Sequence, residues 1–293
     1  MDGVLRLPPH FTEQVRGFLD GTVKPAEPRN AATIVLMREG RTQDPGALEV
    51  YLLRRHLDMA FAGGMAVFPG GGVDPRDFDH AVAWVGPSPE EWAARLGVDV
   101  PLAKALVCAA VRETFEESGV LFAGPTEDSI VEDTTGADWE DDRRRLEARE
   151  LSFTDFLARR ELKLRSDLLR VWSTWLTPVF EPRRYMTWFF VAELPPGQET
   201  RDVSTESVEV TWLPVREAIT AADEQEMLVL PPQYCTFLEL FDCSTPHVAF
   251  EAAAGRDLGT VEPTGVIEGE VAYVKLPDHL VELAGEVSKR LRA

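Results

Sequence analysis

The sequence predicts an α/β protein, because segments typical of strands alternate along the chain with segments typical of helices. Residues 31–37 form an apolar run rich in β-branched side chains, and residues 48–55 form a second run that would pair with it as a hairpin. A helix is expected to begin after Asp99, with Pro101 in its first turn, and to end at Gly119. A chain of 293 residues has room for one large domain or two small ones.

The remaining elements are predicted from the same periodicities and end signals. Ser88 and Glu91 form a capping box around Pro89, and Ser152 is typical of a helix start. The predicted helices are an amphipathic stretch before residue 21, residues 90–96, 157–164, 215–222 and 279–291, and a segment beginning at 231. The predicted strands are one that begins at 120–122, and residues 172–178, 185–194, 208–213 and 272–276.

Proline, glycine and charge divide the chain into parts. Residues 1–29 are expected to hold the N-terminal helix and a linker, and residues 30–245 the main domain. Residues 246–293 are richer in glycine and are expected to form a C-terminal extension packed on this domain. Much of the excess acid lies in residues 127–142, which are expected to be a solvated connecting segment.

The composition excludes several classes of partner. The formal net charge of −20 argues against nucleic acid, since that binding needs a basic surface. No apolar run approaches the roughly 18 residues of a membrane span, and residues 1–16 lack the apolar core of a signal peptide. Cys108, Cys235 and Cys243 are odd in number and lack paired metal spacing. We therefore expect reduced thiols in a cytoplasmic protein, with Cys108 packed on the helix that ends at Gly119.

Three carboxylates mark the predicted helix that ends at Gly119. Glu113, Glu116 and Glu117 stand at i, i+3 and i+4, which places them on one helix face. An isolated glutamate pair is usually a solvated surface. Here an apolar stripe on the same helix would hold the carboxylates beside the glycine-rich segment 63–72 rather than in open solvent. A divalent cation would turn their repulsion into binding, because hard cations take carboxylate oxygens.

These two segments together resemble the Nudix box. That box reads glycine, five residues, glutamate, seven residues, then Arg-Glu-aliphatic-any-Glu-Glu-any-Gly-aliphatic. Gly71 fits the first position, Asp77 stands at the first glutamate, and Arg112 begins the second half. The arginine would be expected at position 85, so 27 extra residues interrupt the box, at about 78–104. Thr114 replaces an aliphatic residue.

A split box of this kind is similar to the coenzyme A diphosphatases of the peroxisomal type. The similarity continues from about residue 31 to about residue 243, including segments 172–178, 183–190 and 230–234. Arg55 and the spacing from Gly64 to Phe68-Pro69-Gly70-Gly71 fit the end of a coenzyme A signature upstream of the box. The resemblance implies a Nudix α/β/α sandwich, with a mixed β-sheet between helices, over residues 30–245.

The resemblance also implies the roles of individual residues. Glu113, Glu116 and Glu117 would bind Mg²⁺ or Mn²⁺ next to the backbone of Gly71, and Arg112 would hold Glu116 in place. The general base stays open between Glu116, Glu117 and Glu206 from a later loop. The residues expected to bind substrate phosphate are Arg54, Arg55, Arg183 and Arg184, together with the loop residues Gly70 and Gly71.

The implied reaction is metal-dependent hydrolysis of a diphosphate linkage in a small nucleoside-containing substrate. Coenzyme A or acyl-CoA would give adenosine 3′,5′-bisphosphate and phosphopantetheine or its acyl form. One alternative is a pyrophosphatase acting on ADP-ribose, NADH or a nucleoside diphosphate sugar. A second alternative is a Nudix-fold module that binds a ligand without cutting it. Neither nucleic acid nor a membrane is expected as a partner, and a homodimer stays open.

Overall fold

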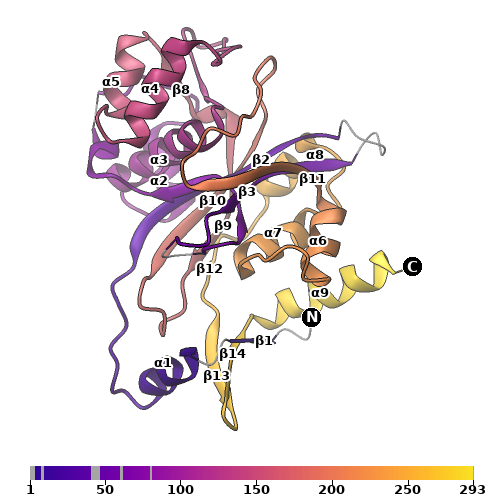
Figure 1. Cartoon of the computed structure of the whole chain (residues 1–293). Helices are drawn as coiled ribbons and strands as arrows, with labels where there is room; N and C mark the ends of the chain where they lie inside the picture. The colour runs from indigo at the N-terminus through magenta and orange to yellow at the C-terminus, as the bar shows by residue number, and fades with distance from the viewer. Residues whose placement is uncertain (1–3, 8–9, 41–46, 60–61, 80, 293) are drawn as a thin grey trace.

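A mixed β-sheet forms the centre of the molecule (Figure 1). The computed structural model describes residues 4–7, 10–40, 47–59, 62–79 and 81–292. Within these ranges the main sheet has the strand order β11-β3-β2-β10-β9-β12, with β4 paired to β3 and β5 paired to β2. The strands are β2 (Arg29–Glu39), β3 (Leu48–Arg55), β4 (Ala66–Val67), β5 (Gly70–Gly72), β9 (Leu169–Leu176), β10 (Tyr185–Glu193), β11 (Ser207–Pro214) and β12 (Thr260–Val261).

The pairing within this sheet is both parallel and antiparallel. β2 and β10 run parallel along nine residue pairs from Arg29↔Tyr185 to Met37↔Glu193. β3 pairs antiparallel with β2 and with β11, so the expected hairpin of the first two strands is confirmed. The hairpin connection, residues 41–46, lies outside the described residues.

Helices cover both faces of the sheet, which confirms the predicted α/β/α sandwich (Figure 1). One face carries the long helix α3 and its neighbours, and the other face carries the helices that follow β11. The first group comprises α2 (Pro89–Leu96), α3 (Val100–Ser118), α4 (Ala137–Glu147) and α5 (Phe153–Arg159). The second group comprises α6 (Val215–Asp223), α7 (Pro231–Leu240), α8 (Pro246–Ala254) and α9 (Asp278–Leu291).

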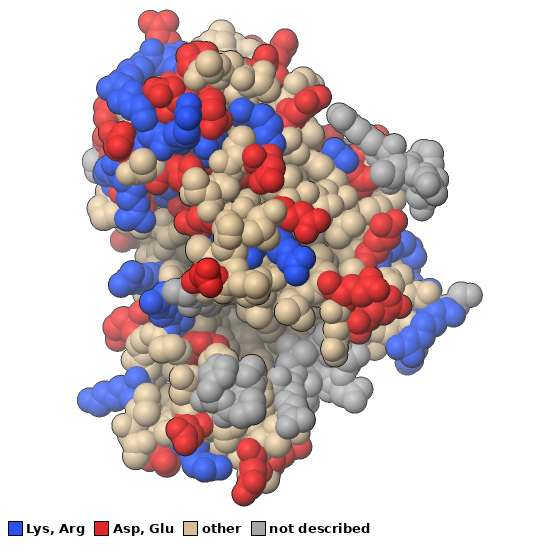
Figure 2. Space-filling view, viewed as in Figure 1, with Lys and Arg blue, Asp and Glu red and all other residues tan. Residues whose placement is uncertain are grey.

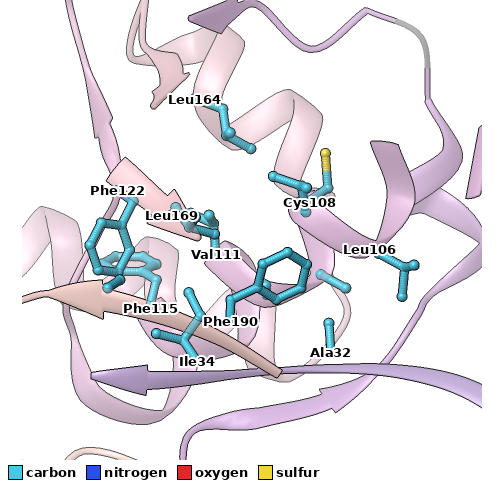
Figure 3. Packing of buried hydrophobic residues seen from close by; sticks show 14 of the residues in the cluster. Ala32, Ile34, Leu106, Cys108, Val111, Phe115, Phe122, Leu164, Leu169 and Phe190 are labelled. Carbon is cyan, nitrogen blue, oxygen red and sulfur yellow. The ribbon is translucent and has the colours of Figure 1, made fainter. Parts of the chain in front are cut away.

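The core beneath α3 fixes the position of that helix on the sheet (Figure 3). Ile34 and Phe190 project from the strands toward Val111 of α3, and all three are fully buried. Phe115, one helical turn further, stacks on Phe156 of α5 with ring centroids 5.2 Å apart. Apolar contacts on this scale hold the helix in one position on the sheet. The backbone positions of its polar residues are fixed by the same contacts.

The segment that interrupts the box is folded into this core. The short strand β6 (Trp84–Val85) pairs with β8 (Lys163–Arg165), which pairs in turn with β7 (Ala123–Gly124). Helix α2 lies on α3, and its fully buried Trp92 contacts Phe190 edge to face at 5.7 Å. The capping box predicted at Ser88 is present.

Two predicted elements differ in the structure. Residues 120–122 are fully buried but are not a strand, because Gly119 turns the chain at a φ of +75° and Leu121 pairs with the Gln198 side chain. Only Ala123–Gly124 forms a strand there. The helix expected at 157–164 ends at Arg159, since Glu161 takes a φ of +54° and the chain continues as β8.

A second, smaller sheet joins the two ends of the chain (Figure 1). Its order is β1 (Val4–Arg6), β14 (Val271–Lys275) and β13 (Thr264–Glu268), and it packs against the predicted N-terminal helix, α1 (His10–Leu19). A small core of Val15, Phe180, Ala272 and Val274 lies between them. The division at residues 29 and 245 stays a prediction. Among the described residues, every helix is too short or too polar to cross a bilayer.

Candidate active site

The glycine turn lies directly against helix α3. β5 pairs with residues 31–33 of β2, and a Cβ at Gly70 would come within 2.6 Å of the Ala32 carbonyl oxygen. A Cβ at Gly71 would come within 2.5 Å of the Glu113 carboxyl group. Real Cβ atoms do not come this close to other atoms. At Gly70 the clash would be with backbone, so only glycine lets β5 lie against β2, whereas at Gly71 the Glu113 side chain would have to move.

Arg112 joins the two halves of the interrupted box. Its Nε and Nη2 donate to the two carboxylate oxygens of Asp77, each at 3.0 Å, in a bidentate pair. Nη2 also donates to the Gly72 carbonyl oxygen at 3.1 Å. Asp77 is 3% exposed and accepts a further hydrogen bond from the Asp74 amide. The residue at the first glutamate position therefore anchors the arginine despite its shorter side chain.

The same guanidinium bonds to two of the three helix carboxylates. Nη1 donates to Glu113 Oε1 at 2.7 Å and to Glu116 Oε1 at 3.2 Å. Glu117 points instead to the glycine turn, where Glu117 Oε2 accepts the Gly70 amide at 2.8 Å. Four acidic side chains thus share one guanidinium and two backbone amides, so carboxyl groups outnumber cationic groups in the cluster.

Burial and mutual repulsion raise the pKa of these carboxyls. The pKa of Glu116 rises to about 8, first because the group is buried and then because Glu113 lies beside it. Burial, followed by repulsion from Glu113, raises the pKa of Glu117 well above its ordinary value. Burial also raises the pKa of Glu113 in spite of the Arg112 hydrogen bond. A bound hard cation would relieve both causes, so the donor chemistry fits Mg²⁺ or Mn²⁺.

As placed, the carboxylates do not converge on one point. Within the described residues, no group of three His, Cys, Asp or Glu side chains is arranged to hold a metal ion. The reason is visible in their present partners, since Glu113 and Glu116 both contact Arg112, whereas Glu117 contacts Gly70. The chemistry of the donors fits a divalent cation, while the side chains are directed to protein partners.

Arg55 and Glu206 complete the cluster from the sheet side. The register of β3 and β11 places Ser207 opposite Arg55, and Arg55 Nη2 bonds Glu206 Oε2 at 2.8 Å. Repulsion from Glu206 contributes to the raised pKa of Glu113 and Glu117, whereas the charge of Arg55 acts in the opposite sense on Glu117. Arg55 Nε is buried and has no hydrogen-bond partner among the described residues, so one donor beside the cluster is free.

The other predicted phosphate-binding arginines lie elsewhere. Arg54 is exposed and faces Glu209 at 3.7 Å, because successive strand residues point to opposite faces. Arg183 is exposed in the turn before β10, and within the described residues it has no hydrogen bond to the cluster. Arg184 is buried, where it bonds the Thr177 and Ala26 carbonyls and the Glu262 carboxylate and so fixes the linker and the C-terminal extension.

Sequence reasoning missed a buried cluster on α4. Most acidic residues of 127–142 are exposed, as expected, but the helix that begins within this segment packs on α3, and Arg143, just beyond it, is 1% exposed. Arg143 bonds Glu140 and Glu147 and donates to the Glu116 carbonyl oxygen at 2.6 Å. The i−3 and i+4 spacing of these glutamates around one arginine was the available signal.

The loop that carries Glu206 is also tied down by residues that no motif indicated. The Arg201 amide donates to the Ser118 carbonyl oxygen at 2.9 Å, and the Tyr51 hydroxyl donates to the Arg201 carbonyl oxygen at 3.2 Å. The Trp212 indole donates to the Thr200 hydroxyl at 2.8 Å. These bonds fix the loop between β10 and β11 against the end of α3 and the edge of the sheet.

Comparison with known proteins agrees with this geometry. Residues 86–240 match the model of the NUDT19 Nudix domain. The chain is 28% identical over 222 residues to acyl-coenzyme A diphosphatase NUDT19 of Xenopus laevis, covering 64% of this chain and 58% of that protein. It is also 28% identical to the Gallus gallus protein of the same name over 277 residues, covering 78% of this chain and 72% of that protein.

Among solved structures, a NUDIX hydrolase from Alicyclobacillus acidocaldarius is 27% identical with a TM-score of 0.67, covering 77% of this chain and 96% of that one. The chain spans just over half the length of the Xenopus relative, so its likeness concerns the shared region. The resemblance seen in the box motifs is confirmed. By the extent of the family match, the chain belongs to the NUDT19 Nudix domain family.

Proposed function

We propose that the protein is a metal-dependent Nudix diphosphatase that hydrolyses coenzyme A or acyl-CoA. The observation that carries the proposal is the closure of the interrupted box around Arg112, which brings Asp77 and the glycine turn to the acidic helix. The products would be adenosine 3′,5′-bisphosphate and phosphopantetheine or acyl-phosphopantetheine. The names of the relatives from Xenopus laevis and Gallus gallus support acyl-CoA as the substrate.

Glu113, Glu116 and Glu117 would hold the cation, next to the backbone of Gly71. When bound, a divalent ion neutralises diphosphate charge and lowers the pKa of a bound water. Mg²⁺ is the expected ion, with Mn²⁺ as its substitute. Burial and mutual repulsion raise the pKa of all three glutamates, and a bound cation would favour their ionised form, which supports this assignment.

The other residues of the cluster would orient the metal-binding glutamates, bind substrate phosphate and accept a proton from water. Arg112 holds Glu113 and Glu116 at the turn, and the partly exposed guanidinium of Arg55 is our candidate donor to a substrate phosphate. Glu206, about half exposed beside Arg55, is our candidate for the general base, with Glu116 and Glu117 as the alternatives. Arg54, Arg183 and Arg184 are left out of the phosphate site.

The surface charge supports a small substrate rather than a nucleic acid. On the face shown in Figure 2, lysine and arginine side chains are interspersed with aspartate and glutamate. With a net charge of −20, phosphate recognition would depend on the local arginine and the cation. The three cysteines are free and buried, which supports a cytoplasmic location.

Product analysis tests the proposal. The protein is incubated with coenzyme A, ADP-ribose and NADH, each with Mg²⁺, with Mn²⁺ and with a chelator. We expect metal-dependent release of adenosine 3′,5′-bisphosphate from coenzyme A. Turnover of ADP-ribose or NADH without turnover of coenzyme A would show that the protein is a diphosphatase with a different substrate. Silence on all three, with binding detected by calorimetry, would favour the ligand-binding module.

A further inference from the structure

Glu147, the last residue of α4, connects two parts of the candidate active site. Its Oε2 accepts Arg143 Nη1 at 3.0 Å. Its Oε1 accepts both the Thr205 amide at 2.9 Å and the Thr205 hydroxyl at 2.8 Å. A carboxylate with three donors on two different elements has a defined position, since charge-assisted hydrogen bonds are stronger than neutral ones.

On the helix side, this contact continues to the box itself. Arg143 Nη1, which bonds Glu147, also donates to the main-chain carbonyl oxygen of Glu116 at 2.6 Å. Glu116 lies in the last turn of α3, where carbonyl oxygens lack partners within the helix. The fully buried Arg143 therefore caps the end of the acidic helix and fixes Glu147 to it.

On the loop side, the contact ends next to Glu206. Thr205 precedes Glu206, whose carboxylate bonds Arg55 and whose carbonyl oxygen accepts the His56 amide at 3.1 Å. Because Thr205 is exposed, apolar packing contributes little to its position. The two hydrogen bonds to Glu147 are thus what joins this part of the loop to α4.

We infer that Glu147 is a positioning residue that sets Glu206 relative to the acidic helix. The inference rests on the proposed function, in which Glu206 handles the proton of the attacking water. Glu147 does not touch the cluster carboxylates in this network; it acts through Thr205. Two side chains, Arg143 and Glu147, connect the loop that carries Glu206 to the backbone of Glu116.

Amide hydrogen exchange tests the contact without any need for turnover. The peptide covering residues 200–208 is followed in the full-length wild type, in Glu147→Ala and in Thr205→Val. Glu147→Ala should speed exchange at Thr205 about tenfold or more, and Thr205→Val should speed it less. Glu150→Ala, the same change at an exposed neighbour, serves as the control and should leave exchange unchanged. Unchanged exchange in Glu147→Ala would overturn the inference.

A kinetic cycle then tests whether the position matters. Glu147→Ala and Glu206→Gln should each lower kcat for coenzyme A, with little change in KM. The double variant should be no slower than Glu206→Gln alone, because Glu147 acts only through Glu206. Thr205→Val, which leaves the contacts of Arg143 intact, should also lower kcat. Each variant must show a cooperative thermal unfolding transition, so that loss of folding is not mistaken for loss of activity. Multiplying effects in the double variant would show a merely structural role and contradict the inference.

The two experiments separate the two claims. A wild type that cleaves none of the three substrates would remove the proposed function, while the exchange measurement would still decide whether Glu147 holds the loop. Normal turnover in Glu206→Gln would reject Glu206 as the base and the positioning role with it.

Discussion

Two buried arginines in this molecule have opposite electrostatic surroundings. Arg112 on α3 faces Asp77, Glu113 and Glu116, and the pKa of Glu116 is raised to about 8 by burial and by Glu113. Arg143 on α4 faces Glu140 and Glu147. Burial would raise the pKa of Glu140 as well, yet the hydrogen bond and charge of Arg143, together with Arg201, hold it below its ordinary value.

The difference lies in the ratio of charges. Glu140 alone is approached by three guanidinium groups, those of Arg143, Arg144 and Arg201. Around Arg112 the ratio is reversed, with several carboxylates for one guanidinium. A buried cluster in which acidic and basic groups balance typically serves to hold the fold together, whereas one with more carboxylates than cationic groups can bind a cation. Both share the motif of glutamates spaced around an arginine, so the motif alone does not separate them.

The largest expected effect is on the balanced cluster. Arg143→Ala should lower the free energy of unfolding by about 3–5 kcal/mol, because it removes a fully buried guanidinium together with its bonds to Glu140, Glu147 and the Glu116 carbonyl oxygen. Denaturant unfolding measures the change. Arg144→Ala, whose side chain is 63% exposed, should cost less than about 1 kcal/mol. A loss for Arg143→Ala as small as that of Arg144→Ala would remove the contrast between the clusters.

The unbalanced cluster should respond in activity rather than in stability. Glu116→Gln should lower metal-dependent turnover about a hundredfold or more, since metal stabilisation of transition-state charge is worth several kcal/mol. The metal-free variant should be at least as stable as the wild type near pH 8, because glutamine cannot acquire the buried, repelled charge that Glu116 takes on as the pH approaches its raised pKa. Glu90→Gln on the exposed face of α2 is the matched control. Unchanged turnover in Glu116→Gln would show that the assignment is wrong.

The two clusters should also respond to pH with opposite signs. The folded-state pKa of Glu116 is raised from 4.5 to about 8, so its contribution to stability is complete below pH 4.5 and is lost as the pH rises toward 8. Glu140, with its lowered pKa, contributes stability above pH 4.5 that is lost as the pH falls further. Unfolding of the metal-free protein at several pH values measures both.

Added Mg²⁺ provides the control for that profile. Because the cation would favour the ionised carboxylates, Mg²⁺ should reduce the loss of stability of the wild type between pH 5 and 8. Glu116→Gln should show a smaller loss over the same pH range without any metal. A metal-free protein whose stability rises steadily from pH 5 to 8 in both wild type and Glu116→Gln would contradict the electrostatic reading of the Arg112 cluster.

The smallest change tests the glycine turn. Gly71→Ala would bring a methyl group to within 2.5 Å of the Glu113 carboxyl, which can move because it ends a flexible side chain. We expect turnover to fall about tenfold through misplacement of Glu113, with a stability loss below about 1 kcal/mol. Gly72→Ala is the matched control, since a Cβ there would meet no atom within 4 Å. Equal effects at both positions would show that contact with Glu113 is not the cause.

Local chemistry made part of this site predictable. Asp99 accepts the Leu102 amide at 2.8 Å and Gly119 takes a positive φ, so the ends of α3 follow from short-range signals. The carboxylate face follows from helical spacing alone. Strand alternation could also have separated Arg54 from Arg55, because only one of two neighbours can face α3.

Long-range contacts were beyond such reasoning. Arg55 meets Glu206 only because β3 pairs with β11, and 151 residues separate the two in the chain. Arg184 resembles a substrate ligand in sequence, yet it bonds the Ala26 carbonyl and the Glu262 carboxylate, which belong to segments far from it in the chain. Arg143 directly follows the acid-rich segment, and only the packing of α4 on α3, which the sequence does not reveal, makes its ion pairs buried.

The folded interruption of the box has a consequence for how such enzymes diversify. What the site requires is the pair of bonds between Asp77 and Arg112, which is a constraint on distance in space and not on the number of intervening residues. This insertion returns the chain to the same point and adds α2 to the core. The spacer can therefore differ in length between related proteins while the acidic helix keeps its place, and a search for the contiguous pattern would overlook proteins with a long spacer.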